Sequence, residues 1–185
     1  MERGAGSAGA GPPRLRAIDV PIEELPAVDE HSVEIDAPQA KTWDALLPVL
    51  RRGFGGPAAT HVSRALGCAE TAIAGDPLHP GATLPGFVVA RAVPPTLYAL
   101  LGAHRFARYA LVFRIDRLGV DRSRLRAETR AEFPGAAGRA YRVLVIGTRG
   151  HVLVVRRLLR TVRLRAEDRP GRSSSGSAWS GQRQC

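Results

Sequence analysis

The chain has 185 residues, of which 44% are hydrophobic and 24% are charged, a composition typical of a globular domain with a core. Its formal net charge is +10, and almost all of the cation is arginine because Lys41 is the sole lysine. Two cysteines, Cys68 and Cys185, are too few for a disulfide framework. No apolar run reaches the roughly 18 residues of a membrane-spanning helix, and the N-terminus lacks the apolar stretch of a secretory signal. These features argue against secreted and transmembrane classes and predict a cytoplasmic protein.

Composition along the chain predicts one folded domain with flanking segments. The N-terminal tail is rich in Gly and Ala, and the C-terminal tail contains the polar run RSSSGSAWSGQ. Between the first tail and the domain lies an extended lead-in that contains two prolines. The predicted division is a disordered tail (1–13), an extended lead-in (14–30), a folded domain (31–167) and a second disordered tail (168–185).

The first predicted elements are a strand and a helix. Residues 31–35, HSVEI, alternate as a short strand does. Asp36 is a candidate N-cap, and Pro38 is tolerated in a first helical turn. The helix that follows carries Trp43 as its anchor, and Pro48 is expected to kink or end it. A second short helix over 58–66, closed by Gly67 as C-cap, and a brief strand over 70–74 are expected next.

Four strand-like segments follow in quick succession. They cover residues 87–93, 97–106, 108–118 and 123–133, and their short connections predict antiparallel neighbours. In the third segment Tyr109, Leu111, Phe113 and Ile115 share one face. In the fourth, Leu125, Ala127, Thr129, Ala131 and Phe133 share one face, and charged residues from Arg124 to Glu132 occupy the other. One apolar and one solvent-facing side are therefore expected for this sheet.

The stretch 138–165 predicts one long C-terminal helix of about 40 Å. Breakers bound it, since Pro134 and Gly135 precede it and Pro170 follows it. Its expected buried face consists of Tyr141, Leu144, Val145, Thr148, Val152, Val155, Leu159 and Val162. The predicted fold is therefore α+β: a curved antiparallel sheet wrapped around a long C-terminal helix, with one or two short helices after the first strand. Such an arrangement leaves a space for a ligand between sheet and helix.

These residues also carry a resemblance to a known family. The opening VEIDAPQAKTWDALLPV, with Asp-Ala-Pro after a strand and a Trp five residues beyond the Pro, resembles the start of the START-like (SRPBCC) superfamily, including polyketide cyclase/dehydrase-like members. The resemblance covers roughly 32–167. It implies a helix-grip fold with a hydrophobic tunnel for lipids, polyketides or similar molecules. Because the superfamily contains both enzymes and binding proteins, the resemblance does not decide the activity.

Two polar residues are predicted to point into this space. Alternation places His104 on the inward face of its strand, where it would hydrogen-bond a ligand or act as an acid or base; a satisfied core histidine is the plainer interpretation. Arg91 shares a face with Phe87 and Val89 and, if inward, would need an anionic partner, unless a bulge turns it to solvent. The predicted ligand-binding residues are Phe87, Val89, Arg91, Tyr98, Leu100, His104, Tyr109, Leu111, Phe113, Tyr141, Leu144 and Val152.

Three functions remain open at this point. The first is a non-catalytic module that binds a small hydrophobic molecule. The second is an enzyme of the polyketide cyclase/aromatase kind, in which His104 or a tyrosine moves protons. The third is a basic surface that contacts nucleic acid or an anionic membrane through the arginines between 156 and 165, which are otherwise a solvated helix face. No cofactor, metal site or specific nucleic-acid partner is predicted, and His151 is expected to pack within the long helix.

Overall fold

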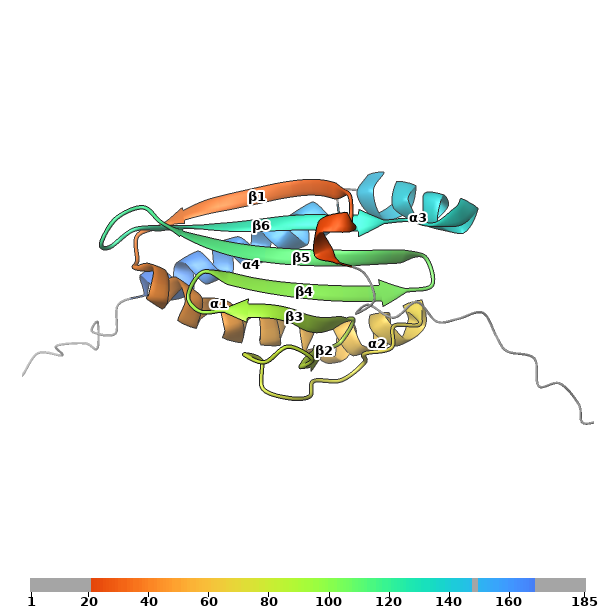
Figure 1. The fold of residues 1–185 in the computed structure, drawn as a ribbon, viewed down its shortest axis with the longest axis horizontal. Coiled ribbons are helices and arrows are strands. Elements are labelled where there is room, and N and C mark those ends of the chain that lie inside the picture. Colours follow the sequence, from red (N-terminus) through yellow and green to blue (C-terminus); the bar gives the residue numbers. More distant parts are fainter. Residues whose placement is uncertain (1–20, 148–149, 169–185) are drawn as a thin grey trace, which may run out of the picture.

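The computed structural model describes residues 21–147 and 150–168, and this part of the chain forms one six-stranded sheet with α-helices on one of its faces (Figure 1). The predicted α+β fold is thereby confirmed. In chain order the elements are a 3₁₀ helix (Ile22–Glu24), β1 (Ala27–Ile35), α1 (Gln39–Phe54), α2 (Pro57–Leu66), β2 (Thr83–Leu84), β3 (Phe87–Val93), β4 (Leu97–His104), β5 (Ala107–Arg117), β6 (Ser123–Glu132), α3 (Gly135–Gly147) and α4 (Gly150–Glu167).

The sheet is antiparallel throughout and has the strand order β1-β6-β5-β4-β3-β2. Strand alternation divides its side chains between two cores. The inner face, under the helices, buries Val89, Leu100, Leu111, Phe113 and Leu125 among others. The outer face buries a smaller set, Val88, Ala99, Leu101, Ala103, Ala110 and Val112, beneath Leu25 from the segment before β1. The expected solvent-facing side is therefore partly covered by the lead-in.

Two helices, rather than one, cover the inner face. α1 buries Trp43, Leu46 and Leu50 against the sheet, with the Trp43 ring edge-on to Tyr98 at 5.9 Å. α4 packs beside it and buries Val155, Leu159 and Val162, as predicted. The first of the helices after β1 was expected to be short, but α1 has 16 residues and covers the sheet together with α4.

The start and the length of α1 differ from the prediction. Pro38, not Asp36, occupies the N-cap position, and the Asp36 N–H donates to Glu167 at 3.1 Å. Pro48 neither ends nor shortens the helix, which continues to Phe54. Burial of Leu46 and Val49 on either side of this proline holds the helical path, so that packing overrides the lost hydrogen bond. α2 ends at Gly67 in a left-handed conformation (φ 77°), as predicted.

The predicted single C-terminal helix is two helices. α3 ends at Gly147 and α4 begins at Gly150, and Figure 1 shows α3 at the end of the sheet while α4 lies beneath it. Glycine favours the helix less than any residue except proline, so the two glycines mark the place where one helix gives way to the next. Leu144 of the expected buried face is 63% exposed in α3. Thr148 lies outside the described residues, as do the predicted N-terminal tail and residues 169–185 of the predicted C-terminal tail.

α4 runs beside β1 in the same direction and is attached to it at both ends. His151 Nε2 lies 2.8 Å from Asp29 Oδ2 at one end, and Glu167 accepts the Asp36 N–H at the other. From His151 to Glu167 the helix rises about 24 Å, while the strand extends about 23 Å from Asp29 to Asp36. The equal lengths allow both contacts to form at once.

The remaining differences lie at strand ends. β1 begins at Ala27, four residues before the predicted start at His31, and the predicted strand over 70–74 is a single bridge between Ala74 and Thr83. β3 has the predicted bounds, and β4, β5 and β6 differ from theirs by one or two residues.

Candidate functional site

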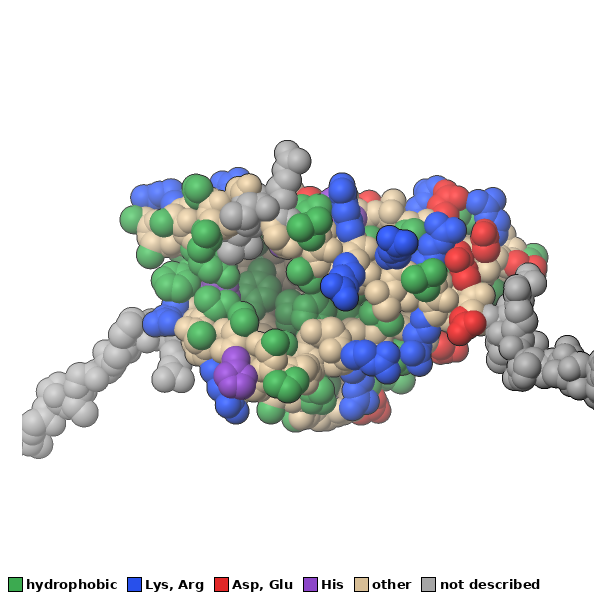
Figure 2. Space-filling model, turned by 180° about the vertical axis from the view of Figure 1, so that it is seen from behind, with side chains coloured by type: hydrophobic (Ala, Val, Ile, Leu, Met, Phe, Trp, Pro, Cys, Tyr) green, Lys and Arg blue, Asp and Glu red, His purple; other side chains and the backbone are tan. Residues whose placement is uncertain are grey.

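A cavity of about 210 Å³ opens at one end of the inner face. The C-terminal end of α2, the β4–β5 hairpin, β6, α3 and the first turn of α4 meet there. Figure 2 shows the helix-covered side hollowed between the α2 and α3 regions, with hydrophobic side chains on the floor. We call this space the end cavity; its lining residues are Leu66, His104, Ala107, Tyr109, Thr129, Ala131, Phe133, Tyr141 and His151.

Three of the predicted ligand-binding residues, His104, Tyr109 and Tyr141, line the end cavity. Five others fill the middle of the space between sheet and helices: Val89, Tyr98, Leu100, Leu111 and Phe113 are buried in the core against α1 and α4. Phe87 is half-buried, with its ring edge-on to Tyr109 at 5.2 Å. The cavity therefore occupies one end of the predicted tunnel, because the side chains of α1 close the rest.

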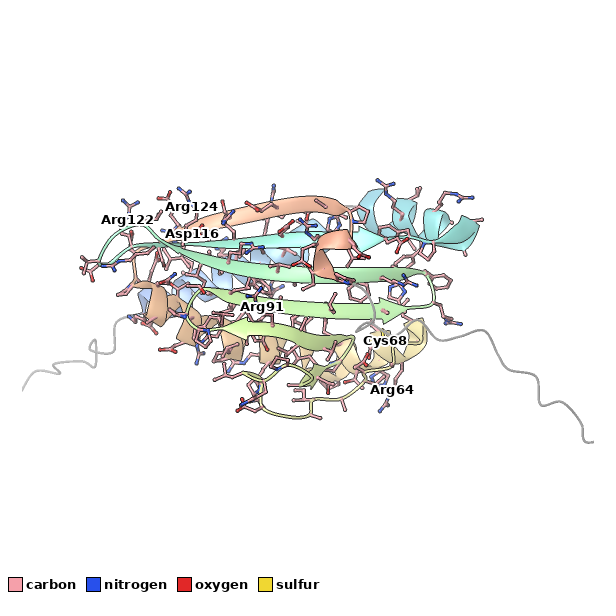
Figure 3. All side chains as sticks on the ribbon, in the orientation of Figure 1. Arg64, Cys68, Arg91, Asp116, Arg122 and Arg124 are labelled. Atoms are coloured by element: carbon pink, nitrogen blue, oxygen red, sulfur yellow. The ribbon has the colours of Figure 1, made fainter. Side chains whose placement is uncertain are left out.

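Arg91 does not point into the space between sheet and helices. Residues Val89 and Arg91 of β3 pair with the consecutive residues Leu100 and Ala99 of β4, which leaves Ala90 as a bulge. The extra residue reverses the alternation, so Arg91 shares the outer face with Ala99 and is exposed (Figure 3). The inward orientation that would make Arg91 a ligand-binding residue is therefore wrong, and the alternative that the sequence left open, a bulge that turns the side chain to solvent, is the one found.

Two predicted wall residues of the C-terminal helix also lie elsewhere. Leu144 is exposed in α3, and half-buried Val152 is not among the residues that line the end cavity. The break between α3 and α4 changes the helical phase on which both predictions depended.

His104 lies at the end of β4 with a side chain that is almost completely buried. Its Nδ1 accepts a hydrogen bond from the Phe106 N–H at 3.1 Å, which assigns the proton of the neutral ring to Nε2. Burial, and to a smaller extent the neighbouring Arg105, lowers the pKa of His104 to about 4. The ring is therefore neutral at physiological pH and has an Nε2–H donor in a mostly apolar cavity.

The two cavity tyrosines are also uncharged near neutral pH. Burial raises the pKa of Tyr109 well above its usual value and also raises that of Tyr141. The Tyr109 hydroxyl donates to the carbonyl of Gly86 at 2.8 Å, and the Tyr141 ring stacks on Phe106 at 5.4 Å and lies edge-on to His104 at 4.9 Å. Together these rings form an aromatic wall around the His104 imidazole.

His151, which was expected to pack within the long helix, lines the end cavity. Its Nε2 is 2.8 Å from Asp29 Oδ2, and the Nε2 of His31 is 3.4 Å from the same oxygen. Asp29 and His31 share the inner face of β1 because they are two residues apart. This spacing is the one feature of the sequence that could have indicated their proximity. Their meeting with His151, more than a hundred residues away in sequence, depends on the packing of α4 against β1.

The described residues contain neither a group of three or more His, Cys, Asp or Glu side chains able to hold a metal ion nor a helix with the length and apolarity to cross a bilayer.

Several solved structures are similar to this chain. The Zhui aromatase/cyclase from Streptomyces sp. R1128 superposes with a TM-score of 0.52 at 15% identity, over 78% of this chain and 94% of that one. Truncated norcoclaurine synthase from Thalictrum flavum gives 0.46 at 14% identity (79% and 99% covered), and a conserved protein from Geobacillus kaustophilus gives 0.40 at 18% identity (75% and 91% covered). No protein-family model and no curated protein matches the sequence. At such identities the likeness concerns the fold, and the first comparison confirms the helix-grip fold that the START-like resemblance implied.

Proposed function

We propose that this helix-grip protein binds a small, flat, largely apolar molecule in the end cavity, with a hydrogen-bond acceptor of the ligand placed at His104. The observation that carries the proposal is the neutral His104 ring, whose Nδ1 is occupied by the Phe106 N–H and whose Nε2–H is available in an apolar cavity. A carbonyl or ether oxygen is the matching group.

The size and the walls of the cavity favour a compact ligand. Its volume of about 210 Å³ is below the roughly 300–1,000 Å³ of sites for drug-sized molecules. The rings of Tyr109, Phe133 and Tyr141 offer faces and edges to an aromatic body. Among the ligand classes that the family resemblance implied, a molecule of one or two fused rings fits better than a long-chain lipid.

A matched pair of ligands tests the proposal. Calorimetric binding of an aromatic ketone is compared with that of the hydrocarbon in which a methylene group replaces the carbonyl. We expect the wild type to prefer the ketone by about three- to tenfold, the effect of one hydrogen bond, and His104→Phe to lose this preference while still binding the hydrocarbon. His79→Phe, a change at an exposed histidine in a loop, is the control. Equal affinities for both ligands in the wild type would contradict the proposal.

A second function, acid–base catalysis of the cyclase/aromatase kind, has support from a different residue. With a pKa of about 4, His104 is a weak base at neutral pH. His151, oriented by the Asp29 carboxylate, is the better candidate to move a proton in the same cavity. The test is the mass of a linear polyketone after incubation with the protein: a catalyst removes water or changes the product distribution, and His151→Gln abolishes that change. A binder returns the compound unaltered.

A further inference from the structure

A second open site lies along the free edge of the sheet. In the part of the chain that the structure describes, β1 is an edge strand whose only strand partner is β6. Between this edge and α4 is a groove of about 550 Å³, lined by His31, Ser32, Val33, Arg156, Leu159, Arg160, Arg163, Leu164 and Glu167. We call it the edge groove. Three consecutive residues of β1 line it. Side chains of consecutive strand residues point to opposite faces, so the groove must run along the backbone edge that all three share.

The edge groove is cationic. Arg156, Arg160 and Arg163 follow one another along α4 at spacings of four and three residues and therefore lie on the same side of the helix. Glu167 is the one acidic residue in the lining, and it already accepts from Arg163 Nε at 2.9 Å. Within the described ranges 21–147 and 150–168, Arg156 and Arg160 form no ion pair.

Two arginines near the other end of β1, Arg122 and Arg124, differ from Arg156 and Arg160 because they form ion pairs. Arg122 and Arg124 both bind Glu34 at 2.8 Å, at the end of the sheet labelled in Figure 3. Arg156 and Arg160 are thus left with charge to offer, while Arg122 and Arg124 are paired with carboxylates.

The strand edge supplies a second kind of contact. In an edge strand, every other residue directs its N–H and C=O groups away from the sheet, where another extended chain can pair with them. Between Val28 and Ile35, the described part of the chain contains no backbone–backbone hydrogen bond from β1 to any element except β6. The groove therefore offers a pairing edge beside a row of cations.

The spacings of the two elements agree. Arg156 and Arg160 are about 6 Å apart along the helix axis, and alternate residues of a strand are about 6.8 Å apart. An extended segment paired with β1 would thus present every second side chain at intervals that match these arginines. Leu164, which follows Arg163 in the lining and is 63% exposed, can receive an apolar side chain.

We propose that the edge groove binds an extended acidic peptide segment, which adds a strand to β1 and places alternate carboxylates on Arg156 and Arg160. This site is separate from the end cavity, and its occupant is a protein partner rather than a small molecule.

The proposal is tested with the full-length protein and a synthetic peptide, acetyl-Thr-Glu-Val-Glu-Val-Glu-Thr-amide, by titration calorimetry. We expect binding that weakens about tenfold or more in Arg156→Glu or Arg160→Glu, the size of a lost charge-assisted contact. Arg165→Glu, an equal charge change on an α4 residue outside the groove lining, should change affinity less than about threefold, as for an exposed ion pair.

Two further measurements separate strand pairing from charge attraction. Amide hydrogen exchange should show new protection in β1 on peptide addition, and a peptide of the same composition with its three glutamates consecutive should bind more weakly. No peptide binding at low salt, equal losses in Arg165→Glu, or unprotected β1 amides would overturn the proposal. So would phosphatidylserine vesicles that bind through Arg156 and Arg160 while the peptide does not, since the partner would then be a membrane surface.

Discussion

At the scale of single residues, the environment of each group decides its chemistry. His104 and His151 line the same cavity, yet one is buried against aromatic rings and the other is paired with a carboxylate. The His104 ring is therefore neutral, while the His151 ring is oriented by the Asp29 carboxylate. Gly102 shows the same dependence on surroundings, because the Tyr109 ring and the Gly86 carbonyl occupy the space where a Cβ would be.

Gly102→Ala is expected to destabilise the protein. A methyl group there would meet both Tyr109 and the backbone of Gly86, and it would disturb the hydrogen bond between them. Overpacking of this kind costs about 1–3 kcal/mol of unfolding free energy. Urea denaturation measures the change. Gly119→Ala, where no atom lies within 4 Å of the added Cβ, is the matched control and should change the free energy little.

The lowered pKa of His104 predicts a pH dependence of stability. The folded state keeps the ring neutral down to about pH 4, while in the unfolded chain it binds a proton below its ordinary pKa of 6.5. Protonation thus favours the unfolded state, and stability contributed by this group is lost as pH falls from 6.5 toward 4. The slope is at most about 1.4 kcal/mol per pH unit for one proton. Urea unfolding of wild type and His104→Phe at pH 7, 6 and 5 should show a steeper decline in the wild type; parallel declines would contradict the assignment.

At the scale of elements, α4 and β1 act as a pair. The strand contributes Asp29 and His31 from its inner face, and the helix contributes His151 from its first turn. The cluster of Asp29, His31 and His151 thus needs both elements. At the other end, the hydrogen bond from the Asp36 N–H to Glu167 keeps the two elements aligned. The edge groove depends on the same alignment.

Asp29→Asn tests this attachment. The substitution keeps the shape of the side chain but removes the charge that assists the hydrogen bond with His151. We expect a loss of about 1–2 kcal/mol and faster amide exchange in the first turns of α4. Asp121→Asn, in the turn between β5 and β6, is the control. Unchanged exchange in α4 would mean that this contact does not hold the helix on the strand.

At the scale of the whole molecule, the fold has two unequal cores on the two faces of one sheet. The inner core contains the large side chains of α1, α4 and the strands, while the outer core depends on a few residues before β1. Leu25 is 2% exposed and covers Val88, Leu101 and Val112. The predicted lead-in thus contributes to the folded structure.

Leu25→Ala is expected to cost about 2–4 kcal/mol of unfolding free energy, the usual effect of emptying a buried leucine site. This loss of unfolding free energy is the one expected for a core residue, although Leu25 precedes the predicted domain (31–167). Thermal or urea unfolding measures it, and Val120→Ala, at a 75% exposed position, is the control. A loss no larger than that of the control would show that the segment before β1 is dispensable for stability.

Much of this fold could be predicted from the sequence because strand alternation and helical periodicity are local. The inward direction of His104, the shared faces of β5 and β6, the cap at Gly67 and the antiparallel order all follow from neighbours in sequence. The tertiary structure decided the rest. The bulge at Ala90 turned Arg91 outward, α1 filled the middle of the expected tunnel, and the packing of α4 on β1 brought Asp29 to His151. The last two outcomes depend on which distant side chains compete for the same space, and no local pattern contains that information.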